Sequence, residues 1–328
     1  MFTSRRRRER SPSAARRPQP FAATEGLATL GEWLRFGEKL LSRSGLAFGQ
    51  VATNPHDEAL ALILHALKLP LDSGSGAKAR RLRPEEKVAV LALLRRRMEE
   101  RIPTAYLTRE AWLGGKRFYV DERVIIPRSY FVEIIPRLGR WLGAKTFSSR
   151  LRIADVCTGS GCLAILLAGY FPGGKVDAID LDPGALEVAR INLRSHRLAR
   201  RVRLWTSDLF DAVPPARYDL IVSNPPYEPS ARLDTLPPEF RREPWLALDG
   251  GVDGLAVIRR LIRQARQRLS GRGALLIEVG GLRRAIDREF AAERPEWLPT
   301  EDGSDCICLI RAGRGAAKAQ GAIRRHRL

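Results

Sequence analysis

The sequence predicts an α/β protein with a parallel, doubly wound sheet in the second half of its 328 residues. From about residue 151 onward, short apolar runs rich in β-branched residues alternate with segments of helical periodicity. This alternation is typical of parallel sheets with helices on both faces. Glycine-rich or polar residues follow four of the predicted strands, and ligands of such sheets bind at that edge. We therefore expect the functional site there.

Before this sheet, apolar spacing predicts three helices, over residues 27–41, from Asn54 to before Pro70, and over 84–101. Asn54 is a favourable cap, and the proline after it fits the first helical position. These helices define a predicted helical domain over residues 24–102.

The periodicity changes over residues 103–129, which are predicted to form a β-hairpin connector around Gly114-Gly115. Its expected strands span 106–113, 116–120 and 123–126.

The last predicted domain covers residues 130–310. Its expected strands are 151–156, 176–180, 202–205, 220–223, 274–279, 297–300 and 305–310. Its expected helices are 130–142, 161–170, 183–195, 251–269 and 282–292.

The net charge of +20 is concentrated at the two ends of the chain. Residues 1–20 hold seven arginines and one glutamate, and residues 311–328 hold six basic residues and no acidic one. Basic tails of low hydrophobicity are therefore predicted over 1–23 and 311–328, and both are expected to be disordered. They are either solvated ends or segments with a weak attraction to RNA. An organelle transit peptide is the alternative for the first tail.

The chain contains no run of eighteen apolar residues and no secretory signal pattern. Its cysteines, at positions 157, 162, 306 and 308, form no C-x-x-C pair, and no metal site is predicted. This pattern indicates a reduced, cytoplasmic setting without membrane contact.

The tetrapeptide Asn224-Pro225-Pro226-Tyr227 directly follows a predicted strand. Each proline fixes its own φ angle, lacks an N–H donor and favours extended geometry in the residue before it. The side chain of Asn224 is therefore expected to point into the crevice at the strand's carboxyl end. An ordinary turn is the simpler interpretation, and the neighbouring motifs decide between the two.

This tetrapeptide suits a planar –NH2 group, whose nitrogen is a poor nucleophile because its lone pair is delocalised. The side-chain oxygen of Asn224 and the carbonyl oxygen of Pro225 can accept its two N–H bonds, while the ring of Tyr227 packs against its plane. These contacts would direct the lone pair toward an electrophile and stabilise the charge that develops on nitrogen. The sequence shows no strong base, and positioning is expected to suffice.

The loop after the first predicted sheet strand is a candidate cofactor site because its glycines allow close backbone approach to a ligand. It matches neither G-x-G-x-x-G nor a P-loop, which disfavours phosphate binding. The loop instead suits the amino-acid end of S-adenosylmethionine, and a tight strand–helix turn is the alternative. Its expected cofactor-binding residues are Asp155, Cys157, Thr158, Gly159, Ser160 and Gly161.

The next two strand ends supply carboxylates. Asp180 lies where doubly wound folds place the carboxylate that binds ribose hydroxyls, although a helix-start role is the alternative. Asp208 can accept a hydrogen bond from an adenine amine, with Leu209 beside it, or belong to a surface turn. Asn224 is expected to contact the cofactor as well as the acceptor.

Together these residues resemble the class I S-adenosylmethionine-dependent methyltransferases, and the Asn-Pro-Pro-Tyr sequence narrows the resemblance to enzymes that act on planar nitrogens. The chain is most similar to the protein-glutamine methyltransferases of the HemK/PrmC/PrmB type, over about residues 27 to 310. This resemblance implies a Rossmann-like sheet, S-adenosylmethionine as cofactor and a substrate-recognition role for the helical domain.

Several segments look like the PrmB branch, which methylates a glutamine of the large-subunit ribosomal protein uL3. They are 101–108, Ala111-Trp112, 118–124 and 126–130. Glu243-Pro244 and the segment 249–255 fit either branch, whereas the arginine-rich ends and Ser129-Tyr130 depart from the family pattern. The resemblance thus implies uL3 as the protein partner, with a release-factor glutamine methyltransferase of the PrmC type as the alternative.

Two other classes of function remain open from the sequence. An rRNA or DNA base-amine methyltransferase uses the same nitrogen grip, but no separate base-recognition domain is evident. A non-enzymatic ribosome-assembly module would have kept only the fold, which the retained Asp180, Asp208 and Asn224 disfavour.

Overall fold

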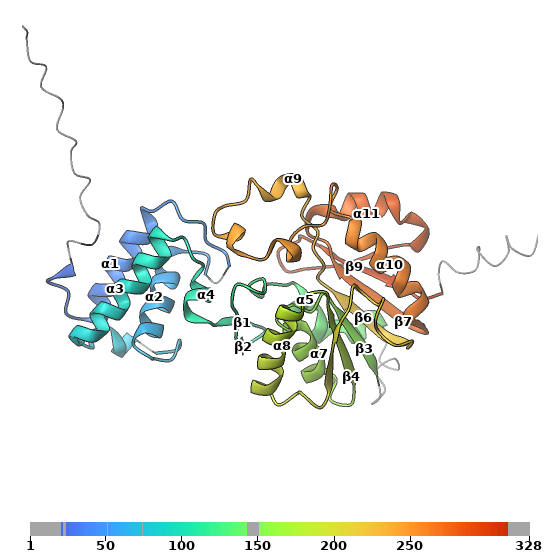
Figure 1. Cartoon of the computed structure of the whole chain (residues 1–328), viewed down its shortest axis with the longest axis horizontal. Coiled ribbons are helices and arrows are strands. Elements are labelled where there is room, and N and C mark those ends of the chain that lie inside the picture. The colour runs from blue at the N-terminus through green and yellow to red at the C-terminus, as the bar shows by residue number, and fades with distance from the viewer. Residues whose placement is uncertain (1–20, 22–23, 51, 74, 143–150, 314–328) are drawn as a thin grey trace, which may run out of the picture.

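The computed structural model describes residues 21, 24–50, 52–73, 75–142 and 151–313. Helices α1 (Leu30–Ser42), α2 (Pro55–Ala66) and α3 (Pro84–Glu99) lie at one end of the molecule, and the large sheet with its helices lies at the other (Figure 1). The predicted basic tails fall almost entirely outside the described residues. The inner ends of both tails do not, because Phe21 is buried in the core of the N-terminal helices and strand β9 (Ile307–Arg311) includes Arg311.

The three N-terminal helices share a hydrophobic core of their own. Thr29 and Glu32 form a capping box at the start of α1, and Asn54 accepts a hydrogen bond from Asp57 N at the start of α2. The predicted cap of the second helix is therefore confirmed. Side chains from all three helices, such as Trp33, Leu62 and Leu94, are at most 1% exposed.

The connector differs from the prediction. Residues 104–108 form helix α4 (Thr104–Thr108), and only β1 (Ala111–Leu113) and β2 (Lys116–Phe118) pair as an antiparallel hairpin. Strand β2 ends early because the N–H of Tyr119 donates to Asn192 Oδ1 at 2.7 Å rather than to a neighbouring strand. Residues 123–126 form no strand, and Val124 and Ile126 are buried against helix α8 (Pro183–Ser195) instead.

The large sheet has seven strands in the order β5-β4-β3-β6-β7-β9-β8. Its remaining strands are β3 (Arg152–Val156), β4 (Lys175–Asp180), β5 (Val202–Thr206), β6 (Tyr218–Ser223), β7 (Leu269–Glu278) and β8 (Glu296–Leu298). The doubly wound α/β class is confirmed. Each of the strands β5, β4, β3, β6 and β7 runs parallel to its neighbour in this group. The expectation of a wholly parallel sheet was wrong, because β9 is antiparallel to both β7 and β8.

Helices cover both faces of the sheet (Figure 1). On one face, α7 (Cys162–Tyr170) and α8 (Pro183–Ser195) pack on side chains such as Ile153. On the other, α10 (Ala256–Arg268) and α11 (Arg283–Glu289) pack on side chains such as Ala154. Successive strand residues point to opposite faces, so each strand contributes to two cores.

Shorter elements complete the described chain. These are α5 (Phe131–Ile134), α6 (Leu138–Leu142), α9 (Ser230–Leu233) and the 3-10 turns η2 (Ser75–Ala79), η3 (Ile135–Arg137), η5 (Phe240–Arg242), η6 (Trp245–Ala247), η7 (Gly280–Leu282) and η8 (Ala291–Glu293). None of the described helices is both long and apolar enough to cross a lipid bilayer.

Helix α10 starts five residues later than predicted. Gly251 and Gly254 have φ angles of +86° and +78°, which a helix does not allow. Residues 250–254 form instead a tight turn against the backbone of Tyr227.

Candidate functional site

Two cavities meet at the carboxyl edge of the sheet. The first, which we call the aspartate cavity, has a volume of about 270 Å³. It is lined by six of the predicted cofactor-binding residues, Cys157, Gly159, Asp180, Asp208, Leu209 and Asn224. Apolar side chains form much of its remaining wall, including Ile179, Leu246 and Val257.

The other four predicted cofactor-binding residues do not line this cavity and shape the loop around it. Asp155 is fully buried, and its Oδ2 accepts hydrogen bonds from Thr158 Oγ1 at 2.5 Å and Ala164 N at 2.9 Å. Burial raises the pKa of Asp155 to about 7. The carbonyl of Ser160 accepts from Asn192 Nδ2 at 2.9 Å, which ties the loop to helix α8.

Gly161 is required at its position by both conformation and space. Its φ angle is +78°, and an added β-carbon would lie 3.1 Å from the β-carbon of Ala189 in α8. The glycine therefore lets the first turn of α7 approach α8 closely.

Asp180 ends β4 and faces the aspartate cavity. Its Oδ2 accepts from the N–H of Gly159 at 2.8 Å, and its Oδ1 accepts from the N–H of Asp182 at 3.0 Å. These two bonds fix the carboxylate and leave further lone pairs for a ligand. Asp182 in turn caps α8, so it is Asp182, and not Asp180, that fills the helix-start role given as the alternative for Asp180.

Two residues in the cavity wall have unusual backbone conformations. Cys157 and Leu209 have φ angles of +60° and +52°, although neither is glycine. Strained residues of this kind concentrate at ligand sites, and both line the aspartate cavity. Burial raises the pKa of the Cys157 thiol well above its usual range, so this thiol stays protonated and is not an activated nucleophile.

Asp208 is paired in a way that the sequence did not reveal. Its Oδ2 lies 2.9 Å from Arg260 in α10, and Arg260 also lines the cavity. The second carboxylate oxygen of Asp208 accepts no hydrogen bond within the described chain and can accept one from a ligand amine.

The second cavity, which we call the proline cavity, has a volume of about 290 Å³ and is lined by all four residues of the tetrapeptide. Asn224 and Pro226 line both cavities. The structure thus places the predicted nitrogen grip at the junction between the two spaces.

The amide of Asn224 is oriented by the connector. Its Nδ2 donates to the carbonyl oxygen of Arg128 at 3.4 Å, so its Oδ1 is left as an acceptor. The carbonyl of Pro225 accepts no hydrogen bond from the described residues. Both acceptors that the sequence assigned to the grip are therefore available.

Tyr227 is held in place by glycines from two loops. An added β-carbon at Gly280 would lie 2.6 Å from the ring, and at Gly254 it would lie 2.4 Å from the carbonyl oxygen of Tyr227. Beyond the ring, Glu228 N donates to Leu248 O at 3.0 Å and Gly250 N donates to Glu228 O at 2.8 Å. The tetrapeptide is therefore embedded between the 248–254 segment and the end of β7.

A buried ion pair closes one wall of the proline cavity. Arg128 donates two hydrogen bonds of 2.7 Å to Glu243, whose side chain is fully buried. Gln50 donates to the same carboxylate at 2.5 Å, and the guanidinium of Arg128 lies 5.5 Å from the ring centre of Phe240. Sequence comparison had marked the segments with Arg128 and Glu243 but gave them no role.

A second buried carboxylate joins the same loop to the N-terminal helices. Glu239 is fully buried and lies 2.8 Å from Arg101 and 3.5 Å from Arg97. Arg97 is itself buried and pairs with Glu58 of α2 at 2.6 Å. No local sequence signal marked this cluster.

Two further carboxylates near the tetrapeptide were also missed. Glu228 lines the proline cavity and pairs with Arg232 at 3.4 Å. Glu278 is buried at the end of β7, accepts from Ser129 Oγ at 2.5 Å, and its pKa is raised to about 7 by burial. No base was expected from the sequence, and the structure places the carboxylate of Glu228 in the wall of the proline cavity.

The residues of the aspartate cavity fit S-adenosylmethionine. A β-carbon at Gly159 would meet no atom within 4 Å, so a ligand can approach this backbone from the cavity. Asp180 is a fixed carboxylate that would accept hydrogen bonds from ribose hydroxyls, and the apolar wall suits an adenine ring. When bound, the cofactor supplies an electrophilic methyl group.

The comparisons with known proteins agree with this geometry. Residues 141–236 match the family model of the methyltransferase small domain. The chain is 43% identical over 304 residues to a ribosomal protein uL3 glutamine methyltransferase of Burkholderia pseudomallei, covering 90% of this chain and 96% of that protein. It is 44% identical over 285 residues to the protein of the same name from Bordetella pertussis, with coverages of 87% and 95%.

Proposed function

Because this chain belongs to the family of ribosomal protein uL3 glutamine methyltransferases, we propose that it transfers a methyl group from S-adenosylmethionine to a glutamine side-chain amide of uL3. The observation that carries this proposal is the shared position of Asn224 and Pro226 in the walls of both cavities. A methyl donor in the aspartate cavity and an amide in the proline cavity would meet at these residues.

In the proposed reaction, Asn224 Oδ1 and the Pro225 carbonyl accept the two N–H bonds of the glutamine amide. The ring of Tyr227 supports the amide plane. Holding the nitrogen in this way directs its lone pair at the methyl group and stabilises the positive charge that develops on nitrogen. Asp180, Asp208 and the loop after β3 hold the cofactor.

The methylated nitrogen must then lose a proton, and we propose Glu228 as its acceptor. Its carboxylate lines the proline cavity, and its buried Oε2 accepts no hydrogen bond in the described chain, although Arg232 lies 3.4 Å away as its ion-pair partner. Glu228→Gln is expected to lower turnover by about 10² and to leave cofactor affinity unchanged. Unchanged turnover would mean that water takes the proton.

The helical domain and the connector are proposed to recognise uL3. They contact the wall of the proline cavity through Gln50, Arg128 and Arg101. Ribosomal proteins are made in the cytoplasm, and the enzyme is proposed to act there.

The test is transfer of labelled methyl groups to purified acceptors, followed by mass analysis of the modified residue. Free uL3 should be methylated on glutamine without rRNA, release factors should be poor acceptors, and naked rRNA should accept none. Preferential labelling of release factors would refute the substrate assignment, and labelling of rRNA alone would favour a base-amine methyltransferase. No labelling despite cofactor binding would indicate a binding module.

The same assay tests the nitrogen grip. Asn224→Ala is expected to cut turnover by about 10² or more, as for the loss of one oriented transition-state partner, with cofactor affinity nearly unchanged. Asn54→Ala is a matched control because Asn54 caps α2, far from both cavities. The control should cost about 1 kcal/mol of stability without lowering turnover.

A further inference from the structure

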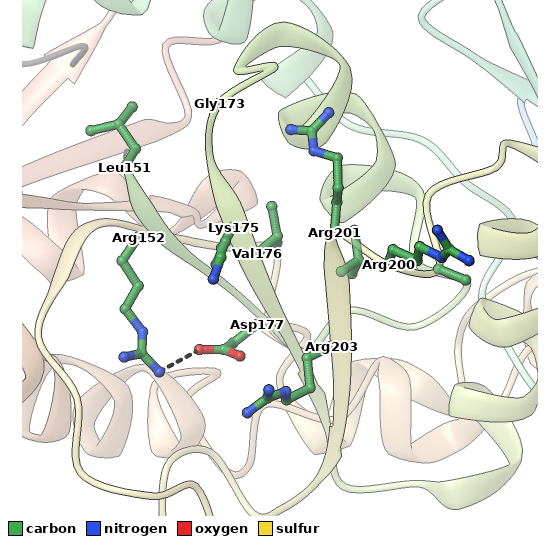
Figure 2. A pocket seen from close by; sticks show the side chains of 11 residues that line it. Leu151, Arg152, Gly173, Lys175, Val176, Asp177, Arg200, Arg201 and Arg203 are labelled. Atoms are coloured by element: carbon green, nitrogen blue, oxygen red, sulfur yellow. Dashed lines mark hydrogen bonds and ion pairs between the residues drawn. The ribbon is translucent and has the colours of Figure 1, made fainter. Parts of the chain in front are cut away.

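A third cavity, which we call the basic pocket, lies at the opposite edge of the sheet. It has a volume of about 790 Å³ and surrounds the amino ends of β3, β4 and β5 (Figure 2). The charged residues that line it are Arg152, Lys175, Asp177, Arg200, Arg201 and Arg203. Because parallel strands all run the same way, this edge faces away from Asp180 and Asn224.

The pocket exists because part of one sheet face has no helix over it. Residues 207–217, all of them described, connect β5 to β6 without a helix, and α10 packs on the strands beyond. Arg152 is the register partner of Lys175, and Asp177 is the register partner of Arg203. These paired positions point to the same face of the sheet, so the cations gather on the uncovered strip.

The single carboxylate of the pocket is already occupied. Asp177 accepts hydrogen bonds from Arg152 at 3.2 Å, from Trp205 Nε1 at 3.0 Å and from the Tyr218 hydroxyl at 2.9 Å. Figure 2 shows its side chain turned toward Arg152. It therefore neutralises at most one of the five cations.

The other cations have no acidic partner in the part of the chain that the structure describes. Lys175 and Arg200 make no ion pair there, and Arg203 only lies over the ring of Trp205, 5.5 Å from its centre. Arg201 donates to the carbonyls of Phe171 and Gly174, at 2.6 and 3.1 Å, which orients it without neutralising it. By contrast, Arg259 on α10 pairs with two carboxylates.

We propose that the basic pocket binds the phosphodiester backbone of RNA. Arginine and lysine are the side chains that neutralise phosphates in such complexes. Three strands span about 10 Å, which is wider than one phosphate group and suits successive phosphates. No aromatic residue is among the described residues that line the pocket. The nearby rings of Tyr218 and Trp205 lie under Arg152 and Arg203, so bases have no free ring to stack on and binding should not depend on sequence.

The choice of RNA rests on the proposed function, because a substrate that is a ribosomal protein is surrounded by rRNA during assembly. The pocket would then let the enzyme hold RNA on one edge while uL3 enters the other. This contact uses other residues than the arginine-rich ends of the chain, for which the sequence leaves solvated ends and weak attraction to RNA as alternatives.

The test is fluorescence anisotropy of the full chain with a labelled oligouridylate of about 20 nucleotides, measured from 0.1 to 1 M salt. Lys175→Gln with Arg203→Gln removes two exposed cations of the pocket. If both contact phosphates, the magnitude of the slope of log affinity against log salt should decrease by about 1.4. From 0.1 to 1 M salt, the wild type should therefore lose roughly 25-fold more affinity than the variant. Arg263→Gln with Arg284→Gln is the matched control on α10 and α11, and it should change neither value.

Two further measurements separate loss of RNA binding from misfolding and from loss of activity. Arg200→Gln alone, which lies outside the strands and cannot disturb the sheet, should reduce the slope by about 0.7 even if the double variant folds poorly. Methyl transfer to free uL3 should be unchanged in all these variants. Failure of the wild type to transfer methyl groups would refute the proposed function. The anisotropy measurement would still decide whether the basic pocket binds RNA.

Three results would overturn the proposal. The first is equal loss of affinity in the control variant. The second is displacement of RNA by inorganic phosphate or polyglutamate at equal charge concentration, which would indicate a general anion surface. The third is loss of all salt-dependent binding when Arg5, Arg6, Arg7 and Arg8 are changed to serine while the pocket variants bind normally.

Discussion

Replacing Glu243 by glutamine should loosen the wall of the proline cavity. The carboxylate is fully buried and receives two hydrogen bonds of 2.7 Å from Arg128 and one of 2.5 Å from Gln50. Glutamine keeps the shape and one oxygen acceptor but removes the charge. Arg128 would then be left beside the cavity without its counter-ion.

The magnitude follows from burial. Removing one partner of a buried ion pair costs about 3–5 kcal/mol. Glu243 is buried but Arg128 is 34% exposed, and glutamine keeps one acceptor, so Glu243→Gln falls at the low end, near 3 kcal/mol. For a chain of this size, that corresponds to a fall in melting temperature of roughly 6–12 °C. An exposed pair is worth less than about 1 kcal/mol. Asp253→Asn is therefore a matched control, because Arg259 also binds Asp253 with two hydrogen bonds, but at the surface.

The assay combines thermal unfolding with steady-state kinetics on uL3. Glu243→Gln should raise KM for uL3 more than it weakens cofactor binding, because Arg128, the partner of Glu243, lines the proline cavity. A double-mutant cycle with Arg128→Gln should give a coupling energy of about 2 kcal/mol or more. Additive losses, or a fall in melting temperature no larger than that of the control, would refute the reasoning.

Three other perturbations have defined outcomes. Asp180→Ala should weaken S-adenosylmethionine binding in calorimetric titration by about 2 kcal/mol, as for a lost pair of charge-assisted hydrogen bonds; unchanged affinity would remove Asp180 from the site. Gly280→Ala should lower turnover at least tenfold (about 1.4 kcal/mol), because the added β-carbon would lie 2.6 Å from the ring of Tyr227. Gly303 is the control: its φ angle is +72° and no atom lies near the added β-carbon, so Gly303→Ala should lower stability without lowering turnover. Glu278, with its pKa raised from 4.5 to about 7, favours folding fully below pH 4.5, and this contribution is lost as the pH rises through 7. Glu278→Gln should therefore be about 3 kcal/mol more stable than the parent at pH 8 and nearly equal to it at pH 4.5 in denaturant titrations; a pH-independent difference would contradict this.

The parts of the site that the sequence predicted are those with local causes. Two prolines after a strand fix the backbone of Asn224 whatever surrounds it, and a carboxylate at the end of a parallel strand faces the binding edge. Asp180 and Asn224 accordingly line the cavities. Asp155 was expected among the cofactor-binding residues, but it does not line the aspartate cavity. Its hydrogen bonds to Thr158 and Ala164 hold its carboxylate in the protein interior, which the spacing of residues alone does not reveal.

The rest depended on contacts between distant segments. Arg128 and Glu243 are 115 residues apart, and Gln50 and Glu243 are 193 residues apart. The connector strand was predicted too long because Asn192, 73 residues away, captures the backbone of Tyr119. Periodicity describes each segment by itself, so it cannot show which polar group of another segment will compete for a backbone donor.

The residues proposed to act on the amide and the domain proposed to recognise uL3 are different parts of the chain. The atoms proposed to act on the amide belong to residues 224–228, which are fixed by β6, by the glycines of two loops and by the 248–250 segment. The helical domain reaches this region through the loop that carries Glu239 and Glu243. If the helical domain recognises uL3 as proposed, changes on the exposed surface of its helices should alter which protein loop is accepted and leave the proposed grip on the nitrogen the same. A buried carboxylate at each of these two links makes them costly to break, and this cost holds the helical domain in a fixed position relative to the proline cavity.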